Sequence, residues 1–173
     1  MNNFASLMKQ TIFAVARAIN IHKNYFAYAP FNDTVTAKGE YTPFGNVTKF
    51  NRNNADINRP PFTGVTDGVI SFDQSYGFAI VEVSCEAVNL DEAGRIYLKL
   101  SYQNPGEEKT ELRLTRQTVA ANEYTSLYCC AGLNIQDGTK VFIEVYGANG
   151  GTQFERGWVK LMGCRTTGNP TYI

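Results

Sequence analysis

The sequence predicts a mainly β protein of consecutive short strands, preceded by one helix and a long arm without regular structure. Three observations lead to this fold class. The 173 residues include ten Tyr and eleven Phe, and aromatic residues favour strands over helices. Hydrophobic and polar residues alternate with a period of two in several stretches of the second half, and turn signals separate these stretches. Successive short strands without helices between them are typical of a β-sandwich or barrel.

The helix is expected at the N-terminus, within residues 1–22. Hydrophobic residues recur there at helical spacing, and alanine fills many of the positions between them. Some of them follow alternating steps of four and three residues, which form a short heptad seam. The seam predicts self-association of the helix, although a helix of this pattern can equally lie on its own domain or on another protein. The seam residues expected at a trimer interface are Met8, Ile12, Val15 and Ile19.

Residues 23–64 show no periodicity, but they carry many aromatic rings among Asn, Pro and Thr. Disordered linkers are usually poor in aromatic residues because they bury nothing, and a structureless stretch of about 40 residues is rare in a compact domain. We therefore expect an extended arm that anchors the chain to a neighbouring subunit or a different protein. The alternative is that the arm wraps around its own domain. The expected anchoring rings are Tyr25, Phe26, Tyr28, Phe31, Tyr41, Phe44, Phe50 and Phe62.

Residues 65–173 are expected to form a single β domain. From residue 79 to 87, small hydrophobic residues alternate with mostly polar ones, which indicates a strand with one buried face. Turn signals occur at Asn104-Pro105-Gly106 and at Asp137-Gly138. The expected strands cover residues 77–88, 95–103, 110–116, 118–121, 125–131, 140–146 and 154–162.

Four stretches of this domain follow a recognisable order: SYGFAIVEVSCEAV, GRIYLKLSYQN, TSLYCCAGLNIQDGTKVFIEVYG and TQFERGWVKLMG. Their pattern resembles the globular heads of the complement and tumour-necrosis-factor superfamily. The matching positions are Leu133, Asp137, Gly138, Val141, Ile143, Val145, Phe154 and Trp158. The sequence departs from the family in its order Asp-Gly instead of Gly-Asp, and it lacks the Phe-Ser/Thr-Gly signature before the last strand. The resemblance implies a jelly-roll β-sandwich that trimerises, an architecture that also occurs in phage head-fibre, tail-tip and capsid-decorating proteins.

The strand pattern gives a physical reason to expect a homotrimer. Tyr97, Phe142 and Tyr146 fall on strand faces opposite the aliphatic core residues, so one sheet of a monomer would expose aromatic surface. We expect these three residues to lie in the trimer interface. The alternative is that the rings face the arm of the same chain.

Composition argues against several classes of protein. Sixteen Lys and Arg balance sixteen Asp and Glu, whereas a nucleic-acid partner would favour a basic surplus. No apolar run is long enough to span a membrane. With one histidine and no paired Cys motif, we expect no enzyme activity, no metal and no cofactor. The four cysteines are expected to be buried free thiols, with a disulfide as the alternative.

The charge distribution and the N-terminus bear on function. Residues 1–64 carry seven basic and three acidic residues, a net charge of +4, and residues 65–173 carry nine and thirteen, a net charge of −4. Charged residues interrupt the N-terminal apolar stretch, so we expect no secretion signal. We expect a bacteriophage virion structural protein, assembled in the host cytoplasm. Its helix and arm would attach a trimeric domain to the major capsid protein or another virion protein, as a decorating or fibre-attachment protein of the head. The alternative is a receptor-binding tip for a host glycan, with Asn149 and Trp158 as possible ligand contacts.

Overall fold

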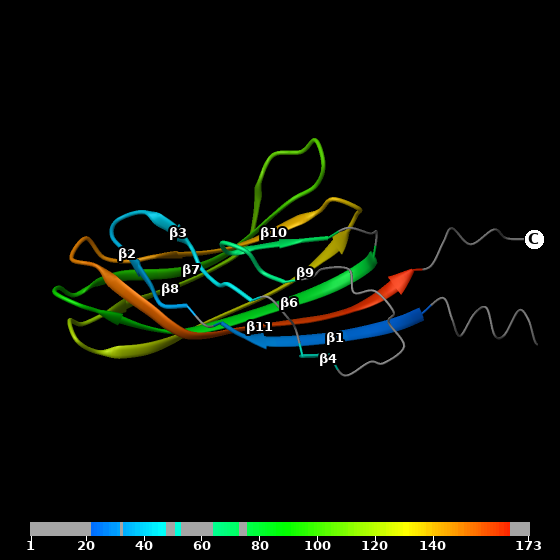
Figure 1. Cartoon of the computed structure of the whole chain (residues 1–173). Coiled ribbons are helices and arrows are strands. Elements are labelled where there is room, and N and C mark those ends of the chain that lie inside the picture. The colour runs from blue at the N-terminus through cyan, green and yellow to red at the C-terminus, as the bar shows by residue number, and fades with distance from the viewer. Residues whose placement is uncertain (1–21, 32, 48–50, 53–63, 73–75, 167–173) are drawn as a thin grey trace, which may run out of the picture.

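The computed structural model describes residues 22–31, 33–47, 51–52, 64–72 and 76–166, which form two antiparallel sheets stacked as a sandwich (Figure 1). The mainly β fold class is therefore confirmed. The strands are β1 (His22–Pro30), β2 (Val35–Ala37), β3 (Tyr41–Pro43), β4 (Asn51–Arg52), β5 (Val69–Ser71), β6 (Tyr76–Asn89), β7 (Gly94–Gln103), β8 (Thr110–Val119), β9 (Tyr124–Ile135), β10 (Lys140–Tyr146) and β11 (Thr152–Thr166). The expected N-terminal helix lies outside the described residues, except for His22, which begins β1.

The larger sheet, called the β1 sheet below, has six strands. Its order is β4-β1-β11-β6-β9, and β2 also pairs with β11. Along β6, Val81, Val83 and Cys85 are buried, whereas the intervening Glu82 and Ser84 are half-buried. This confirms the alternation predicted from the sequence, because successive residues of a strand point to opposite faces.

The second sheet, called the β10 sheet, has five strands. Its order is β3-β10-β7-β8, and β5 also pairs with β10. Leu98 and Leu100 of β7 and Val141 and Ile143 of β10 are fully buried. They pack with the inward residues of the β1 sheet into one hydrophobic core, as in other β-sandwiches.

Aromatic rings fill the core where β11 is bulged. Phe31 and Phe44 meet edge to face with ring centroids 5.1 Å apart, and Phe44 also lies 6.2 Å from Phe154. The pairing of β11 with β6 shifts register between residues 155 and 158, and Gly157 lies in this bulge. A Cβ atom at position 157 would lie 2.4 Å from the Phe31 ring and 2.8 Å from the Phe44 ring. Only glycine therefore allows the rings to approach this backbone.

The described part of residues 23–64 is integrated into the sandwich. β1 runs antiparallel to β11 over its whole length, β2 also pairs with β11, and β3 pairs with β10. Phe31 and Phe44 are buried in the core of the same chain. Their prediction as anchors on another protein is wrong, and the alternative, that this segment wraps its own domain, holds for them. The side chains of Tyr25, Phe26, Phe50 and Phe62 lie outside the described residues.

The cysteines occupy different environments. Cys85 and Cys129 are buried and unpaired, as predicted, whereas Cys130 is unpaired but exposed, contrary to prediction. Burial raises the pKa of the Cys85 thiol to about 12, with the nearby Cys129 adding to the shift. In the described ranges, no helix is long and apolar enough to cross a membrane.

Candidate interaction surfaces

Three tyrosine rings gather on the outward face of the β10 sheet. Tyr97 of β7 and Tyr146 of β10 are directly paired, with ring centroids 5.0 Å apart. Tyr41 of β3 lies against both, at 6.4 Å from Tyr97 and 5.5 Å from Tyr146. Tyr41 comes from the segment that the sequence predicts to be an arm. It covers the two rings that were predicted to be open for trimerisation.

Two lysines, Lys99 and Lys109, contact aromatic rings and Glu144 on the same face of the β10 sheet. Lys99 Nζ lies 3.5 Å above the Tyr41 ring and 3.0 Å from Glu144 Oε2. Lys109 Nζ lies 2.7 Å from Glu144 Oε1 and 4.2 Å from the centre of the Phe142 ring. Burial alone would raise the pKa of the Glu144 carboxyl, but the ammonium groups of Lys109 and Lys99 outweigh it and hold the pKa below its usual value.

These contacts bear on the predicted trimer interface. Tyr97, Phe142 and Tyr146 are each half-buried within one chain. The alternative, in which the rings face the arm of the same chain, describes Tyr97 and Tyr146. A role for the three residues in trimerisation stays a prediction, but the exposed aromatic surface that motivated it is largely covered.

The outward face of the β1 sheet is more open. It carries four exposed large rings: Tyr28 of β1 is 37% exposed, Tyr128 of β9 48%, Phe78 of β6 52% and Tyr124 of β9 62%. Among the described residues, one other large hydrophobic side chain is exposed, that of Tyr41 on the β10 sheet. An exposed group of rings on one sheet marks a candidate interaction surface.

Three of the rings on this sheet form a row, called the aromatic stripe below. The Trp158 ring of β11 lies 6.0 Å from the Tyr28 ring and 6.3 Å from the Tyr128 ring. Trp158 and Tyr128 sit on either side of Ser84 of β6, with which both are paired. Because Ser84 is small, the two rings meet across it. Next to the stripe, Lys160 Nζ forms an ion pair with Glu82 Oε2 at 3.2 Å.

The stripe combines residues that were predicted separately. Tyr28 was expected to anchor an arm, and Trp158 to bind a ligand. Tyr128 was not singled out, although the alternation of Leu127, Tyr128 and Cys129 places it on the outward face of a strand. What the sequence could not show is that β11 and β6 bring β1 and β9 close enough for the rings to meet.

The two predicted ligand contacts are not brought together. Asn149 is exposed in the loop between β10 and β11, near Gly39. Trp158 lies in the stripe, six residues beyond the start of β11, which corresponds to roughly 20 Å along an extended strand. The structure therefore places the two residues in different parts of the surface, and ligand binding by either one stays a prediction.

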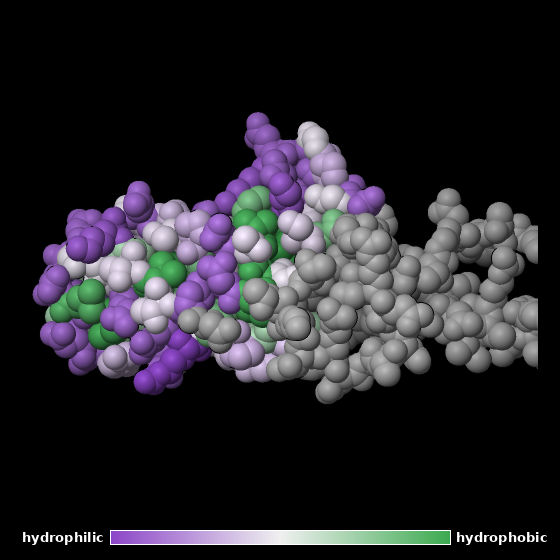
Figure 2. All heavy atoms as spheres, in the orientation of Figure 1, coloured by the Kyte–Doolittle hydropathy of each residue, from purple (hydrophilic) through white to green (hydrophobic). Residues whose placement is uncertain are grey.

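The hydrophilic and hydrophobic residues are unevenly placed on the surface. Figure 2 shows hydrophobic residues in separate patches among hydrophilic ones, and a projecting hairpin that is mostly hydrophilic. This hairpin joins β7 and β8 (Figure 1). It carries two consecutive glutamates, Glu107 and Glu108, which are exposed.

Comparisons with known proteins identify the fold. No protein-family model matches the sequence, and a search of curated proteins finds no relative. Solved structures do match. Eiger TNF from S. frugiperda is 16% identical with a TM-score of 0.62, over 87% of this chain and 99% of that chain. Murine APRIL at pH 5.0 is 10% identical with a TM-score of 0.59, over 82% and 99%.

The globular domain of zebrafish complement 1qA is also similar, at 13% identity and a TM-score of 0.51, over 84% of this chain and 99% of that domain. At these identities the likeness concerns the fold. The protein is a jelly-roll β-sandwich of the kind seen in tumour-necrosis-factor and complement globular heads, as the sequence resemblance implied.

Proposed function

We propose that the protein is a homotrimeric structural protein of a bacteriophage particle, which decorates the head or attaches a fibre to it through its N-terminal segment. The observation that carries the self-association is the aromatic stripe of Tyr28, Trp158 and Tyr128 on an otherwise mixed surface. We place the trimer interface at this stripe of the β1 sheet, and not over the whole outward face of the sheet.

The contrast between the two sheets supports this choice. On the β10 sheet, Tyr41 and the lysines cover the other rings within one chain, and Tyr41 is the one exposed large hydrophobic residue described on that sheet, against four on the β1 sheet. On the β1 sheet, Tyr28 and Tyr128 remain between about one third and one half exposed. Burying such rings against other copies would remove apolar surface from water, which is the main driving force of stable interfaces. Trimerisation is also what the resemblance to the superfamily implies.

The end of the sandwich where the described residues begin is suited to attachment through the segment that precedes it. His22, the first described residue, pairs with Thr166, the last residue of β11. Residues 1–64 have a net charge of +4 and the rest a net charge of −4. The unpaired state of Cys85, Cys129 and Cys130 fits assembly in a reducing cytoplasm. In three linked copies, weak attachments through this segment would add up to strong binding.

Particle attachment is tested with two forms of the protein. The full chain should be trimeric by sedimentation and should co-sediment with gradient-purified virus particles. A chain without residues 1–21 should remain folded but fail to co-sediment. A longer deletion of residues 1–64 would be uninformative, since it removes β1, β2, β3 and β4. Particles that contain none of the full chain, or that retain the shortened chain equally well, would contradict the proposal.

A further inference from the structure

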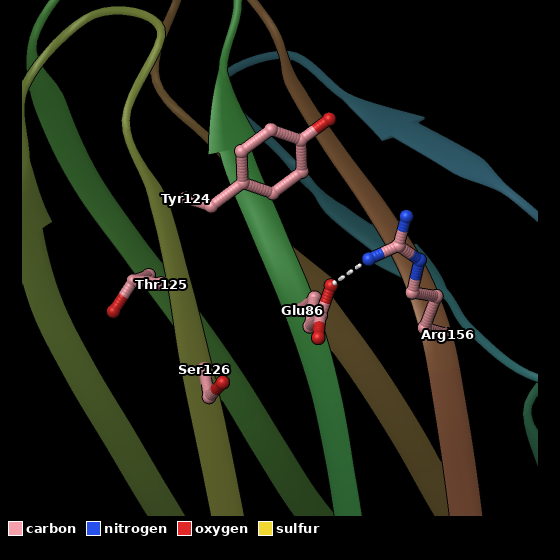
Figure 3. Close-up of a pocket in the computed structure, with 5 residues that line it drawn as sticks. All are labelled: Glu86, Tyr124, Thr125, Ser126 and Arg156. Atoms are coloured by element: carbon pink, nitrogen blue, oxygen red, sulfur yellow. Dashed lines mark hydrogen bonds and ion pairs between the residues drawn. The ribbon is translucent and has the colours of Figure 1, made fainter.

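A polar pocket lies on the β1 sheet beyond the aromatic stripe. Its volume is about 310 Å³, and its lining residues are Glu86 of β6, Tyr124, Thr125 and Ser126 of β9, and Arg156 of β11 (Figure 3). Tyr124 is the first residue of β9. The pocket is therefore near the end of the sandwich opposite to the one where β1 begins and β11 ends (Figure 1).

The β11 bulge brings Arg156 to the pocket. Arg156 has a φ of 49°, a left-handed conformation that is unfavourable for a residue with a Cβ atom. Its side chain is 70% exposed, and its Nη1 donates a hydrogen bond of 2.8 Å to Glu86 Oε2 on the adjacent strand. Bulges commonly redirect a side chain in this way and are frequent next to functional sites.

The pocket offers several groups that can bind a ligand. The Tyr124 ring is 62% exposed, and Figure 3 shows it above Glu86, with Arg156 to one side. In the described part of the chain, the Ser126 and Tyr124 hydroxyls have no hydrogen-bond partner, and Arg156 has spare N–H donors besides those directed at Glu86 and Glu155. Glu86 has a second carboxylate oxygen that can accept.

The charges decide what kind of ligand fits. Glu86 and Arg156 neutralise each other within the pocket, and Glu155 lies 3.8 Å from Arg156 Nε. A strongly anionic ligand would have to approach two carboxylates, and a cationic ligand would have to approach the guanidinium. A neutral ligand with many hydroxyl groups can use both members of the pair, since it donates to Glu86 and accepts from Arg156. An apolar ring face on the same ligand can lie on Tyr124.

We propose that this pocket binds a neutral saccharide. A pyranose ring presents hydroxyl groups around its edge and C–H groups on its faces, which is the combination that Arg156, Glu86 and Tyr124 recognise. The site differs from the one predicted at Asn149 and Trp158, and it does not depend on attachment to a virus particle. In a trimer, three such pockets at the end of the sandwich opposite His22 would bind a sugar-coated surface with increased avidity.

The experiment uses the full chain and a panel of methyl glycosides of glucose, galactose, mannose and N-acetylglucosamine, with N-acetylneuraminic acid as an acidic comparison. Saturation-transfer NMR detects binding and ranks the sugars, and titration gives Kd, expected in the roughly millimolar range for so small a ligand. Tyr124→Ala removes the ring. Arg156→Gly removes the guanidinium and suits the left-handed backbone, so the variant should fold at least as well as the parent.

Asn122→Gly is the matched control for Arg156→Gly. Asn122 also has a positive φ, of 60°, and is exposed in the loop before Tyr124. We expect at least one neutral glycoside to bind saturably, at least tenfold more weakly to Tyr124→Ala and Arg156→Gly, and equally well to Asn122→Gly. No binding of any neutral glycoside, binding unchanged in both pocket variants, or binding of N-acetylneuraminic acid alone would overturn the proposal. Sedimentation of each variant shows whether a loss of binding reflects a loss of assembly, which keeps this result separate from the proposed function.

Discussion

Replacing Tyr128 with threonine should dissociate the trimer without unfolding the subunit. Threonine is chosen because it favours strands as tyrosine does. The ring is 48% exposed in a single chain. A tyrosine side chain can bury about 200 Å², so assembly could remove about 100 Å² of it from water. At about 25 cal/mol per Å², this corresponds to about 2.5 kcal/mol per subunit, as an upper bound because the hydroxyl is polar.

Since three copies contribute, the trimer would lose up to about 7.5 kcal/mol, which is a reduction in the association constant of roughly 10⁵-fold or more. Sedimentation equilibrium over a range of micromolar concentrations measures this change. Thermal unfolding followed by circular dichroism should show a similar transition for the isolated subunit, because the ring that is removed lies on the surface. Association and subunit stability are thereby separated.

Tyr41→Thr is the matched control. Tyr41 is 41% exposed but lies on the β10 sheet, so its removal should leave the trimer intact. If Tyr41→Thr dissociates the trimer and Tyr128→Thr does not, assembly uses the surface around Tyr97 and Tyr146 instead. A parent chain that is monomeric at all concentrations would refute the reasoning altogether.

Three further predictions concern the subunit. Gly157→Ala should lower stability by about 1–3 kcal/mol, and the midpoint of thermal unfolding by several degrees, because the new Cβ clashes with the Phe31 ring; an unchanged midpoint would contradict the packing described. In the folded protein at pH 8, iodoacetamide should modify Cys130 but not Cys85, whose thiol is buried with a pKa near 12; peptide mass mapping, with a urea-unfolded control, checks this. Glu144→Gln should lower the free energy of unfolding by about 1 kcal/mol above pH 4.5, and this difference from the parent should disappear as the pH falls through the lowered pKa of the folded Glu144 carboxyl. Urea titrations at several pH values measure this difference, and a difference that persists in acid would contradict the prediction.

The strands of the second half could be predicted because their signal is local. In β6 and β10, the buried residues follow each other at every second position, and this period is visible in any stretch of sequence. The strand spacing by itself predicted a β-sandwich or barrel, and the jelly-roll architecture was implied by the resemblance to tumour-necrosis-factor and complement globular heads. The strands predicted from the sequence agree with those of the structure where the alternation of hydrophobic and polar residues is long and uninterrupted.

The first part of the chain was misjudged for a physical reason. β2 and β3 are three residues long, too short to show a period. β1 pairs with a strand more than a hundred residues later in the sequence, so its partner cannot be recognised from its own residues. The richness in aromatic rings did indicate burial, but it could not show that Phe31 and Phe44 are buried by their own chain.

Both candidate sites are built from residues that lie far apart in the sequence and come together only in the folded chain. The aromatic stripe needs β1, β11 and β9 to be placed by pairing with one another and with β6. The pocket depends on the bulge at Arg156, and no residue in the surrounding sequence predicts that the backbone of Arg156 adopts a left-handed conformation. Both sites therefore became visible only in the folded structure, although Trp158 had been singled out as a residue of interest.

The central place of β11 has a consequence for synthesis on the ribosome. This strand lies between β1 and β6, yet it is the last of the described strands to emerge. Until β11 emerges, β1 and β6 each have one strand edge without its partner, and β6 is paired only with β9. Nascent chains with open strand edges are prone to aggregate. Productive folding must therefore wait until β11 has left the ribosome, and a chaperone would matter most to this protein up to that point.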